Sequence, residues 1–259
     1  MFDRGQGPPL VVIPGVHGRW EWSKPVLERM AERCRTISYS LCGDIGSGRR
    51  LDRALGFENY VRQLDAVLDA AGVDRAALCG VSFGGFVALR YAVERPDRVS
   101  ALVLASAPGP GFEPNAQQSR WLARPWLSVP AFALTSPARV WPEIRSAIPG
   151  GNRRFRFFVR QGLRCVAAPM IPPLMASRMR AAAVMDFQAD CSRVHARTLV
   201  IAGEEGLDRV VPVWSTRVYT SLIRGAEYAV MPGTGHMGCL TQPERFAEIV
   251  TGFVHADHH

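Results

Sequence analysis

Short apolar runs recur along the chain and are separated by longer segments of mixed polarity. The runs are almost continuously apolar, which is typical of parallel strands covered on both faces rather than of half-exposed strands. They predict six strands, at residues 9–14, 35–40, 76–81, 99–105, 199–202 and 227–231. Between and after them, apolar residues at helical spacing predict helices at residues 22–33, 57–71, 84–94 and 246–255. The alternation predicts an α/β fold with a mostly parallel sheet of about six strands and helices on both faces.

The alternation of strands and helices stops between about residues 108 and 185. This segment contains Trp121, Trp126 and Trp141, six prolines between residues 125 and 169, and no clear strand. It is predicted to be a mostly helical insertion in a core formed by residues 1–107 and 186–259. Open α/β sheets bind ligands at the carboxyl ends of their strands, so we expect this helical insertion (residues 108–185) to cover that edge as a lid. The three tryptophans are expected to contact substrate there.

The charge of the protein is concentrated in the same segment. The net charge is +8, and residues 112–185 hold 11 arginines but only two acids, Glu113 and Glu143, which gives this stretch +9. Such a cluster attracts an acidic substrate or an anionic surface, or it forms a solvated surface, and the solvated surface is the simpler interpretation. Membrane contact through this segment is the less favoured alternative. No nucleic-acid-binding motif accompanies the charge, so no nucleic-acid partner is expected.

Other features predict a cytoplasmic protein and give no sign of a zinc site or a disulfide framework. No run of about 18 apolar residues exists, and the sequence MFDRGQGPPL at the start lacks the pattern of a signal peptide. The six cysteines form no CxxC pair and indicate neither a zinc site nor a disulfide framework. The cysteine spacings therefore give no reason to expect a metal.

A G-x-S-x-G pattern, formed by Gly80, Ser82 and Gly84, lies between a predicted strand and a predicted helix. A sharp turn in this position lifts the serine Oγ clear of the sheet, and small residues two positions before and after let the strand and helix backbones approach. The pattern therefore predicts that Ser82 is a nucleophile. The alternative is a simple tight turn with an exposed serine.

A serine hydroxyl near neutral pH needs a base, and His236 is the best candidate. It lies in a glycine-containing loop between the last predicted strand and the closing helix, where it can reach the sheet edge. His195 fits a surface loop better. The remaining candidates lie in a polar tail, at His255, His258 and His259.

The imidazole in turn needs a carboxylate to fix its tautomer, and Asp208 follows the strand predicted at 199–202. The chain order Ser82, Asp208, His236 is the order expected for this type of fold. Glu204 and Glu205 in the same loop are the alternative acids.

Two backbone N–H groups are expected to stabilise an oxyanion. One belongs to Phe83, at the start of the helix after the nucleophile, and the other to Val16, in the loop after the first strand. One such donor is typically worth about 3 kcal/mol of transition-state stabilisation. His17, next to Val16, is expected either to line the site or to pack against Trp20 and Trp22.

Together these motifs resemble the α/β-hydrolase superfamily, in particular its small lidded esterases and enol-lactonase-like enzymes. The segment PGVHG (14–18) is similar to the oxyanion loop of that family, GVSFGG (80–85) to its nucleophile elbow, LDRVVP (207–212) to its acid segment and GTGH (233–236) to its histidine loop. The chain departs from the family where only about eight residues precede the first predicted strand. The usual N-terminal β-hairpin is therefore expected to be missing or vestigial.

The resemblance implies a serine hydrolase that cleaves a carboxylic ester or a lactone through an acyl-enzyme on Ser82. This mechanism requires no cofactor and no metal, and the expected partner is a small-molecule substrate. The same three residues also serve carbon–carbon bond hydrolases, thioesterases and perhydrolases, so these activities stay open. A ligand receptor that uses the hydrolase scaffold and turns over slowly or not at all is an alternative from another class.

Overall fold

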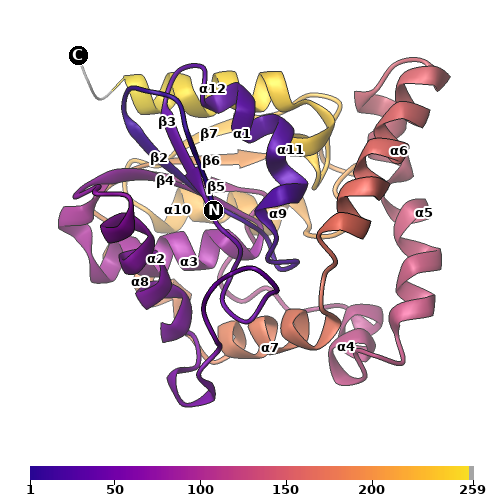
Figure 1. The fold of residues 1–259 in the computed structure, drawn as a ribbon, viewed down its shortest axis with the longest axis horizontal. Helices are drawn as coiled ribbons and strands as arrows, with labels where there is room; N and C mark the ends of the chain where they lie inside the picture. Colours follow the sequence, from indigo (N-terminus) through magenta and orange to yellow (C-terminus); the bar gives the residue numbers. More distant parts are fainter. Residues whose placement is uncertain (257–259) are drawn as a thin grey trace.

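The structure is a computed structural model that describes residues 1–256, apart from the side chains of Phe132 and Ala133. His258 and His259 lie outside the described residues. Within the described part, seven strands form one sheet in the order β1-β3-β2-β4-β5-β6-β7 (Figure 1). β1 pairs with β3 in the antiparallel sense, and all other neighbours are parallel. The strands are β1 (Phe2–Arg4), β2 (Pro9–Ile13), β3 (Arg35–Ser38), β4 (Ala76–Val81), β5 (Val99–Ala105), β6 (Arg197–Ala202) and β7 (Glu227–Val230).

This sheet confirms the predicted α/β architecture. Each of the six predicted strands is present, and β4 and β5 have the predicted bounds. The seventh strand, β1, was not predicted because only Phe2 of its three residues is buried, so no apolar run marks it. It lies at the sheet edge beside β3 and does not form a hairpin with β2.

Side chains alternate between two buried layers along the inner strands. Val11 and Leu78 pack against one set of helices, whereas Val12 and Cys79 pack against the other. The first set is α2 (Glu58–Ala70), α3 (Phe83–Glu94), α8 (Phe187–Ser192) and α10 (Tyr219–Leu222). The second set is α1 (Lys24–Met30), α11 (Gly238–Thr241) and α12 (Pro243–His255). Both faces of the sheet are therefore covered, as parallel strands require.

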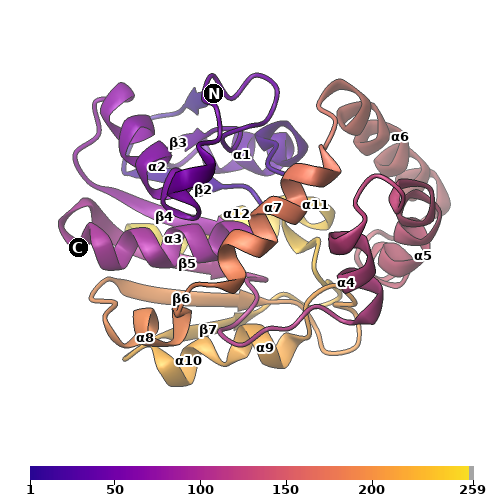
Figure 2. The same ribbon diagram turned by 90° about the horizontal axis from the view of Figure 1, so that it is seen from below.

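The helical insertion separates β5 from α8 and contains no strand within its described backbone. Its helices are α4 (Ala116–Ala123), α5 (Val129–Ala147), α6 (Gly151–Ala167) and α7 (Pro172–Ala183). In Figures 1 and 2, α5 and α6 lie side by side at one side of the molecule, and the rings of Trp141 and Phe158 stack between them at 5.8 Å. The remaining short helices are η1 (Trp20–Ser23), η2 (Arg53–Leu55), η3 (Pro96–Arg98) and α9 (Val213–Arg217). Among the described residues, no helix has the length and apolar character needed to cross a bilayer.

Candidate active site

Ser82 occupies a strained turn between β4 and α3. Its φ angle is 53°, in the left-handed region that residues with a side chain rarely adopt. Glycines make the turn possible. A Cβ on Gly80 would lie 2.3 Å from the Gly84 carbonyl oxygen, and one on Gly84 would lie 2.3 Å from that of Ile13. The close approach of strand and helix that the sequence pattern predicted is therefore present, and it holds Ser82 at the carboxyl end of β4.

The structure brings Ser82, His236 and Asp208 together although 154 positions separate the serine from the histidine. His236 Nε2 lies 3.1 Å from Ser82 Oγ, and His236 Nδ1 lies 3.1 Å from Asp208 Oδ2. An ionised carboxylate can only accept hydrogen bonds, so Nδ1 carries the proton. Nε2 is then the acceptor for the Ser82 hydroxyl, which is the tautomer that general-base chemistry needs.

The loop after β6 fixes the carboxylate of Asp208. Its Oδ1 accepts hydrogen bonds from the backbone N–H groups of Val210 and Val211, at 2.9 and 2.8 Å, which leaves Oδ2 for the imidazole. The side chain is only 3% exposed. Glu204 and Glu205, the alternative acids, lie exposed in the same loop.

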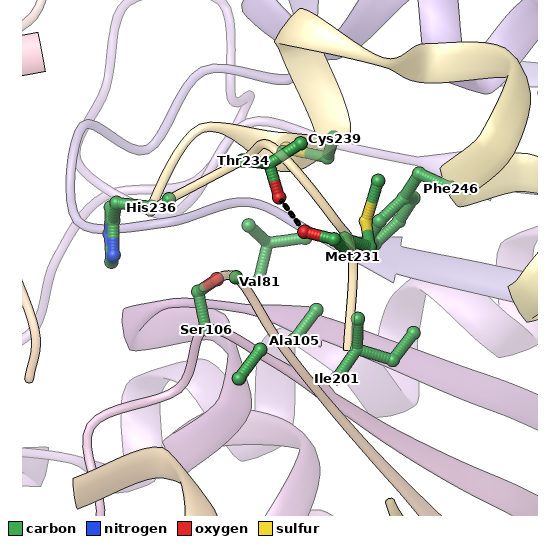
Figure 3. Close-up of a pocket in the computed structure, with 13 residues that line it drawn as sticks. Val81, Ala105, Ser106, Ile201, Met231, Thr234, His236, Cys239 and Phe246 are labelled. Atoms are coloured by element: carbon green, nitrogen blue, oxygen red, sulfur yellow. Dashed lines mark hydrogen bonds between the residues drawn. The ribbon is translucent and has the colours of Figure 1, made fainter. Parts of the chain in front are cut away.

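The loop that carries His236 packs directly on the loop that carries the acid. A Cβ on Gly235 would lie 2.5 Å from the Leu207 carbonyl oxygen, so a glycine is needed there. Thr234 Oγ1 donates a hydrogen bond to the carbonyl oxygen of Met231 at 2.9 Å and closes the turn, as Figure 3 shows. These contacts explain why a glycine-containing sequence precedes the histidine.

Two effects oppose each other at the His236 imidazole. Burial lowers its pKa, whereas the charge and hydrogen bond of Asp208, with a further contribution from Glu143, raise it. The carboxylates prevail, and the pKa of His236 lies above its usual value of 6.5. The environment therefore favours the imidazolium that forms when a proton is taken from Ser82.

Behind His236 lies a small cavity of about 10 Å³, lined by residues that include Ser106 and Cys239 (Figure 3). This is about the volume that one water molecule requires. It is too small for any substrate.

Val16 and Phe83 both lie next to the nucleophile. Phe83 is the first residue of α3, so its N–H has no acceptor within the helix. The loop that carries Val16 approaches closely, since a Cβ on Gly15 would lie 3.3 Å from Ser82 Cβ. Their role as oxyanion donors stays a prediction that these positions suit.

His17 is a neutral histidine at the same edge. Burial, followed by the charges of Arg178, His236 and Arg19, lowers its pKa to about 3. Its ring stacks on Trp22 with centroids 4.5 Å apart, and its Nδ1 accepts the backbone N–H of Arg19 at 3.1 Å. The proton therefore resides on Nε2. His17 makes the predicted packing contact with Trp22 while lying close to the nucleophile loop.

The three tryptophans of the helical insertion have different surroundings. Trp126 and Trp141 are 66% and 41% exposed, and the ring of Trp121 lies 4.7 Å from the guanidinium carbon of Arg139. That these tryptophans contact substrate stays a prediction.

Sequence reasoning missed two buried contacts between the helical insertion and the loops of the site. Arg178 of α7 pairs with Asp44, and its Nη1 donates to the carbonyl oxygen of Val16 at 2.8 Å. Glu143 of α5 accepts the backbone N–H of Met237, next to His236. No local pattern marks such partners, because more than 90 positions separate the members of each pair. The one available signal was the scarcity of acids in an arginine-rich segment.

No group of three or more histidine, cysteine, aspartate or glutamate side chains that could hold a metal ion is found among the described residues. The chemistry that this arrangement supports on its own is nucleophilic attack by an activated hydroxyl.

Comparison with known proteins identifies the family. A model of the alpha/beta hydrolase family matches residues 10–249, so the chain belongs to this family and the predicted resemblance is confirmed. The protein is similar to the 2-hydroxy-6-oxo-2,4-heptadienoate hydrolase of Pseudomonas putida, at 28% identity over 99% of this chain and 92% of that protein. It is also 29% identical to the 2-hydroxymuconate semialdehyde hydrolase of a Pseudomonas species, over 98% of this chain and 89% of that protein.

Solved structures show the same fold. The enol-lactonase of Burkholderia xenovorans superposes with a TM-score of 0.78 at 18% identity, over 98% of this chain and 95% of that chain. This likeness concerns the fold, whereas the family match and the hydrolase relatives support an α/β-hydrolase enzyme.

Proposed function

We propose that the protein is a serine hydrolase that cleaves a carboxylic ester or a lactone. The observation that carries the proposal is the continuous chain of hydrogen bonds from Ser82 Oγ through His236 to Asp208, both links 3.1 Å long. The strained turn at Ser82 and the raised pKa of His236 support it, because both prepare a proton transfer from serine to imidazole.

The reaction proceeds in two stages. His236 Nε2 takes the hydroxyl proton of Ser82 while Oγ attacks the substrate carbonyl carbon, and the N–H groups of Val16 and Phe83 hold the oxyanion. The imidazolium returns its proton to the departing alkoxide as the carbonyl–oxygen bond breaks, which leaves an acyl-enzyme. Water, deprotonated by His236, then releases the acid and restores the Ser82 hydroxyl.

The helical insertion is proposed to act as a lid over this site. It contacts the Val16 loop through Arg178 and the histidine loop through Glu143, so it lies next to the nucleophile. The partner is a small-molecule substrate that enters between these elements.

A second candidate is hydrolysis of a carbon–carbon bond in an enolic dienoate. The curated relatives named for 2-hydroxy-6-oxo-2,4-heptadienoate and 2-hydroxymuconate semialdehyde favour it, since each aligns over nearly the whole chain. Both compounds carry a carboxylate, which suits the arginine-rich insertion.

A p-nitrophenyl ester series of increasing acyl length, measured on the wild type and on Ser82→Ala, tests the proposal. Ser82→Ala is expected to lower kcat by roughly 10⁴- to 10⁶-fold, because the nucleophile is lost. Ser221→Ala, at an exposed serine, is the matched control and keeps the wild-type rate. Equal rates for wild type and Ser82→Ala defeat the proposal.

The two candidate reactions are separated by adding 2-hydroxy-6-oxo-2,4-heptadienoate, whose absorbance falls on cleavage. A kcat/KM at least tenfold above that of the best ester would favour the carbon–carbon reaction. Binding of either substrate without turnover in the wild type would indicate a receptor.

A further inference from the structure

Helix α5 presents a buried carboxylate to the loop that carries the catalytic-site histidine. Glu143 is 1% exposed, and both of its carboxylate oxygens lie 3.0 Å from the backbone nitrogen of Met237, the residue after His236. The hydroxyl of Thr241, on α11, lies 3.2 Å from Oε1 and 3.1 Å from the carbonyl oxygen of Met237, and it can donate to either. The backbone of Gly235, the residue before His236, also acts to lower the pKa of this carboxylate. Glu143 therefore holds the backbone of the residue that directly follows the histidine.

Glu143 has unusual hydrogen-bond partners for an acid in the arginine-rich segment. Residues 112–185 contain 11 arginines, and a carboxylate among them would ordinarily pair with one. The hydrogen-bond partners of Glu143 are instead neutral groups of the histidine loop and α11. A buried carboxylate costs free energy unless it is well hydrogen-bonded, and Glu143 finds its hydrogen bonds in the histidine loop and α11. Its function therefore concerns that loop rather than an arginine.

We propose that Glu143 is a positioning residue for His236, a second carboxylate that fixes the histidine loop and, with Asp208, stabilises the imidazolium during proton transfer. This inference rests on the proposed function of Ser82 and His236. It also gives the helical insertion a part in the chemistry, because α5 must be docked for the carboxylate to reach the loop.

The charges around the imidazole support this role. Asp208 faces it from the loop after β6 and Glu143 from α5, and both raise the pKa of His236. His17, from the loop after β2, has its pKa lowered to about 3 and is neutral. Cys239 on α11 has its pKa raised to about 12, first by burial and then by Glu143, so its thiol is neutral too. Asp208 and Glu143 are therefore the groups on these elements whose charges raise the pKa of the imidazole.

The sign of the expected pH effect follows from these charges. Burial raises the pKa of Glu143 itself, whereas the N–H groups of Met237 and Gly235 and the His236 charge oppose the rise. Where Glu143 is ionised, it favours the charged imidazole, so removing it lowers the pKa of His236. Because the base is active only when neutral, the acid limb of kcat/KM then moves to lower pH.

The test compares Glu143→Gln with Glu113→Gln, which changes the other acid of the arginine-rich segment, an exposed one. In wild type the acid limb is expected above pH 6.5, the usual value for histidine. Glu143→Gln is expected to lower that limb by about 0.5–1 pH unit. It should also lower kcat on the plateau by roughly tenfold, because a misplaced base reacts more slowly. Glu113→Gln should change neither quantity. A plateau loss without movement of the limb would mean that Glu143 only supports the fold, and the proposal would be wrong.

Two further variants keep the charge and disturb the geometry. Thr241→Val removes one donor to the carboxylate, and Glu143→Asp shortens the side chain. Both should lower kcat while the acid limb stays in place, so they separate positioning from charge even if Glu143→Gln fails to fold. If the acid limb of kcat/KM moved as far in Thr241→Val as in Glu143→Gln, the assignment would be contradicted.

Histidine titration by NMR makes the result independent of turnover, with the His236 signal assigned from its absence in His236→Gln. A lower pKa of His236 in Glu143→Gln supports the inference even if no substrate is hydrolysed. Absence of hydrolysis in wild type would count against the proposed function alone, whereas an unchanged His236 titration would count against Glu143 alone.

Discussion

The sheet region and the helical insertion bury their apolar residues to very different degrees. In β4, Leu78 and Cys79 are fully buried, whereas in α6 Phe155 is 70%, Leu163 65% and Val166 80% exposed. The sheet region closes its core by itself. The helical insertion instead leaves much apolar surface in water, beside its arginines.

Two buried charged side chains of the insertion lie where it meets the loops of the candidate site. Glu143 and Arg178 are each 1% exposed, and each contacts a loop beside Ser82 or His236. Substitutions on the surface of the insertion should therefore leave the sheet undisturbed, whereas substitutions of its two buried charged residues should not. We therefore expect the sheet region to determine reaction and stability, and the surface of the insertion to determine substrate preference.

The largest effect should come from Asp208→Asn, in the sheet region. Asparagine Oδ1 can still accept the N–H groups of Val210 and Val211, but its amide then presents a donor to the N–H at His236 Nδ1. The imidazole must turn or change tautomer, and kcat should fall by about 10⁴-fold. Steady-state kinetics on the best ester measures this.

Glu204→Gln and Glu205→Gln are the matched controls for the acid, because both glutamates are exposed in the same loop. Each should stay within about twofold of the wild-type rate, since loss of a solvated charge has little effect. A larger loss from either variant than from Asp208→Asn would move the acid role to that glutamate.

A smaller effect should come from adding one methyl group to each region. Gly80→Ala places a Cβ 2.3 Å from the Gly84 carbonyl oxygen and should destabilise the protein by about 1–3 kcal/mol. Gly162→Ala, inside α6, meets nothing within 4 Å and should stabilise that helix by about 0.5–1 kcal/mol. Urea unfolding followed by circular dichroism measures both. Equal destabilisation by the two substitutions would show that the insertion is packed as tightly as the sheet.

The same difference explains what the sequence could predict. The bounds of β4 and β5 follow from their apolar runs, because a strand buried on both faces has no polar position inside it. The elbow at Ser82 and the histidine loop carry glycines that short backbone contacts require, so their sequence is distinctive. In the insertion, by contrast, α5 continues through Pro137 and Pro142, which local rules would use to end a helix.

The contacts that the sequence did not predict join residues far apart in the chain. Glu143 meets Met237 across 94 positions, and Arg178 meets Asp44 across 134. A buried acid or arginine has the same local surroundings in the sequence as an exposed one. Its burial is decided by tertiary packing, which periodicity and motif spacing do not encode.

The smallest effect we predict concerns the arginines of α6. Replacing Arg153, Arg154 and Arg156 with glutamate should lower kcat/KM for a carboxylate-bearing ester by roughly three- to tenfold, while a neutral ester of equal length keeps its value. The loss should shrink at 0.5 M salt, where charges on the surface are screened over about 4 Å. Competition between the two esters in one reaction measures the preference directly.

The matched control reverses three exposed arginines of the sheet region, Arg33, Arg75 and Arg224. They precede β3, β4 and β7, so they lie at the amino edge of the sheet, opposite the edge at which β4 delivers Ser82. The overall change in charge is identical, and only its location differs. If both triple variants lower kcat/KM for the carboxylate-bearing ester equally, net charge governs the effect. If neither does, the arginines of α6 form a solvated surface and substrate preference must come from residues nearer Ser82. If only the α6 variant loses activity on the acidic ester, the helical insertion attracts acidic substrates. This is the result expected if the surface of the insertion determines substrate preference.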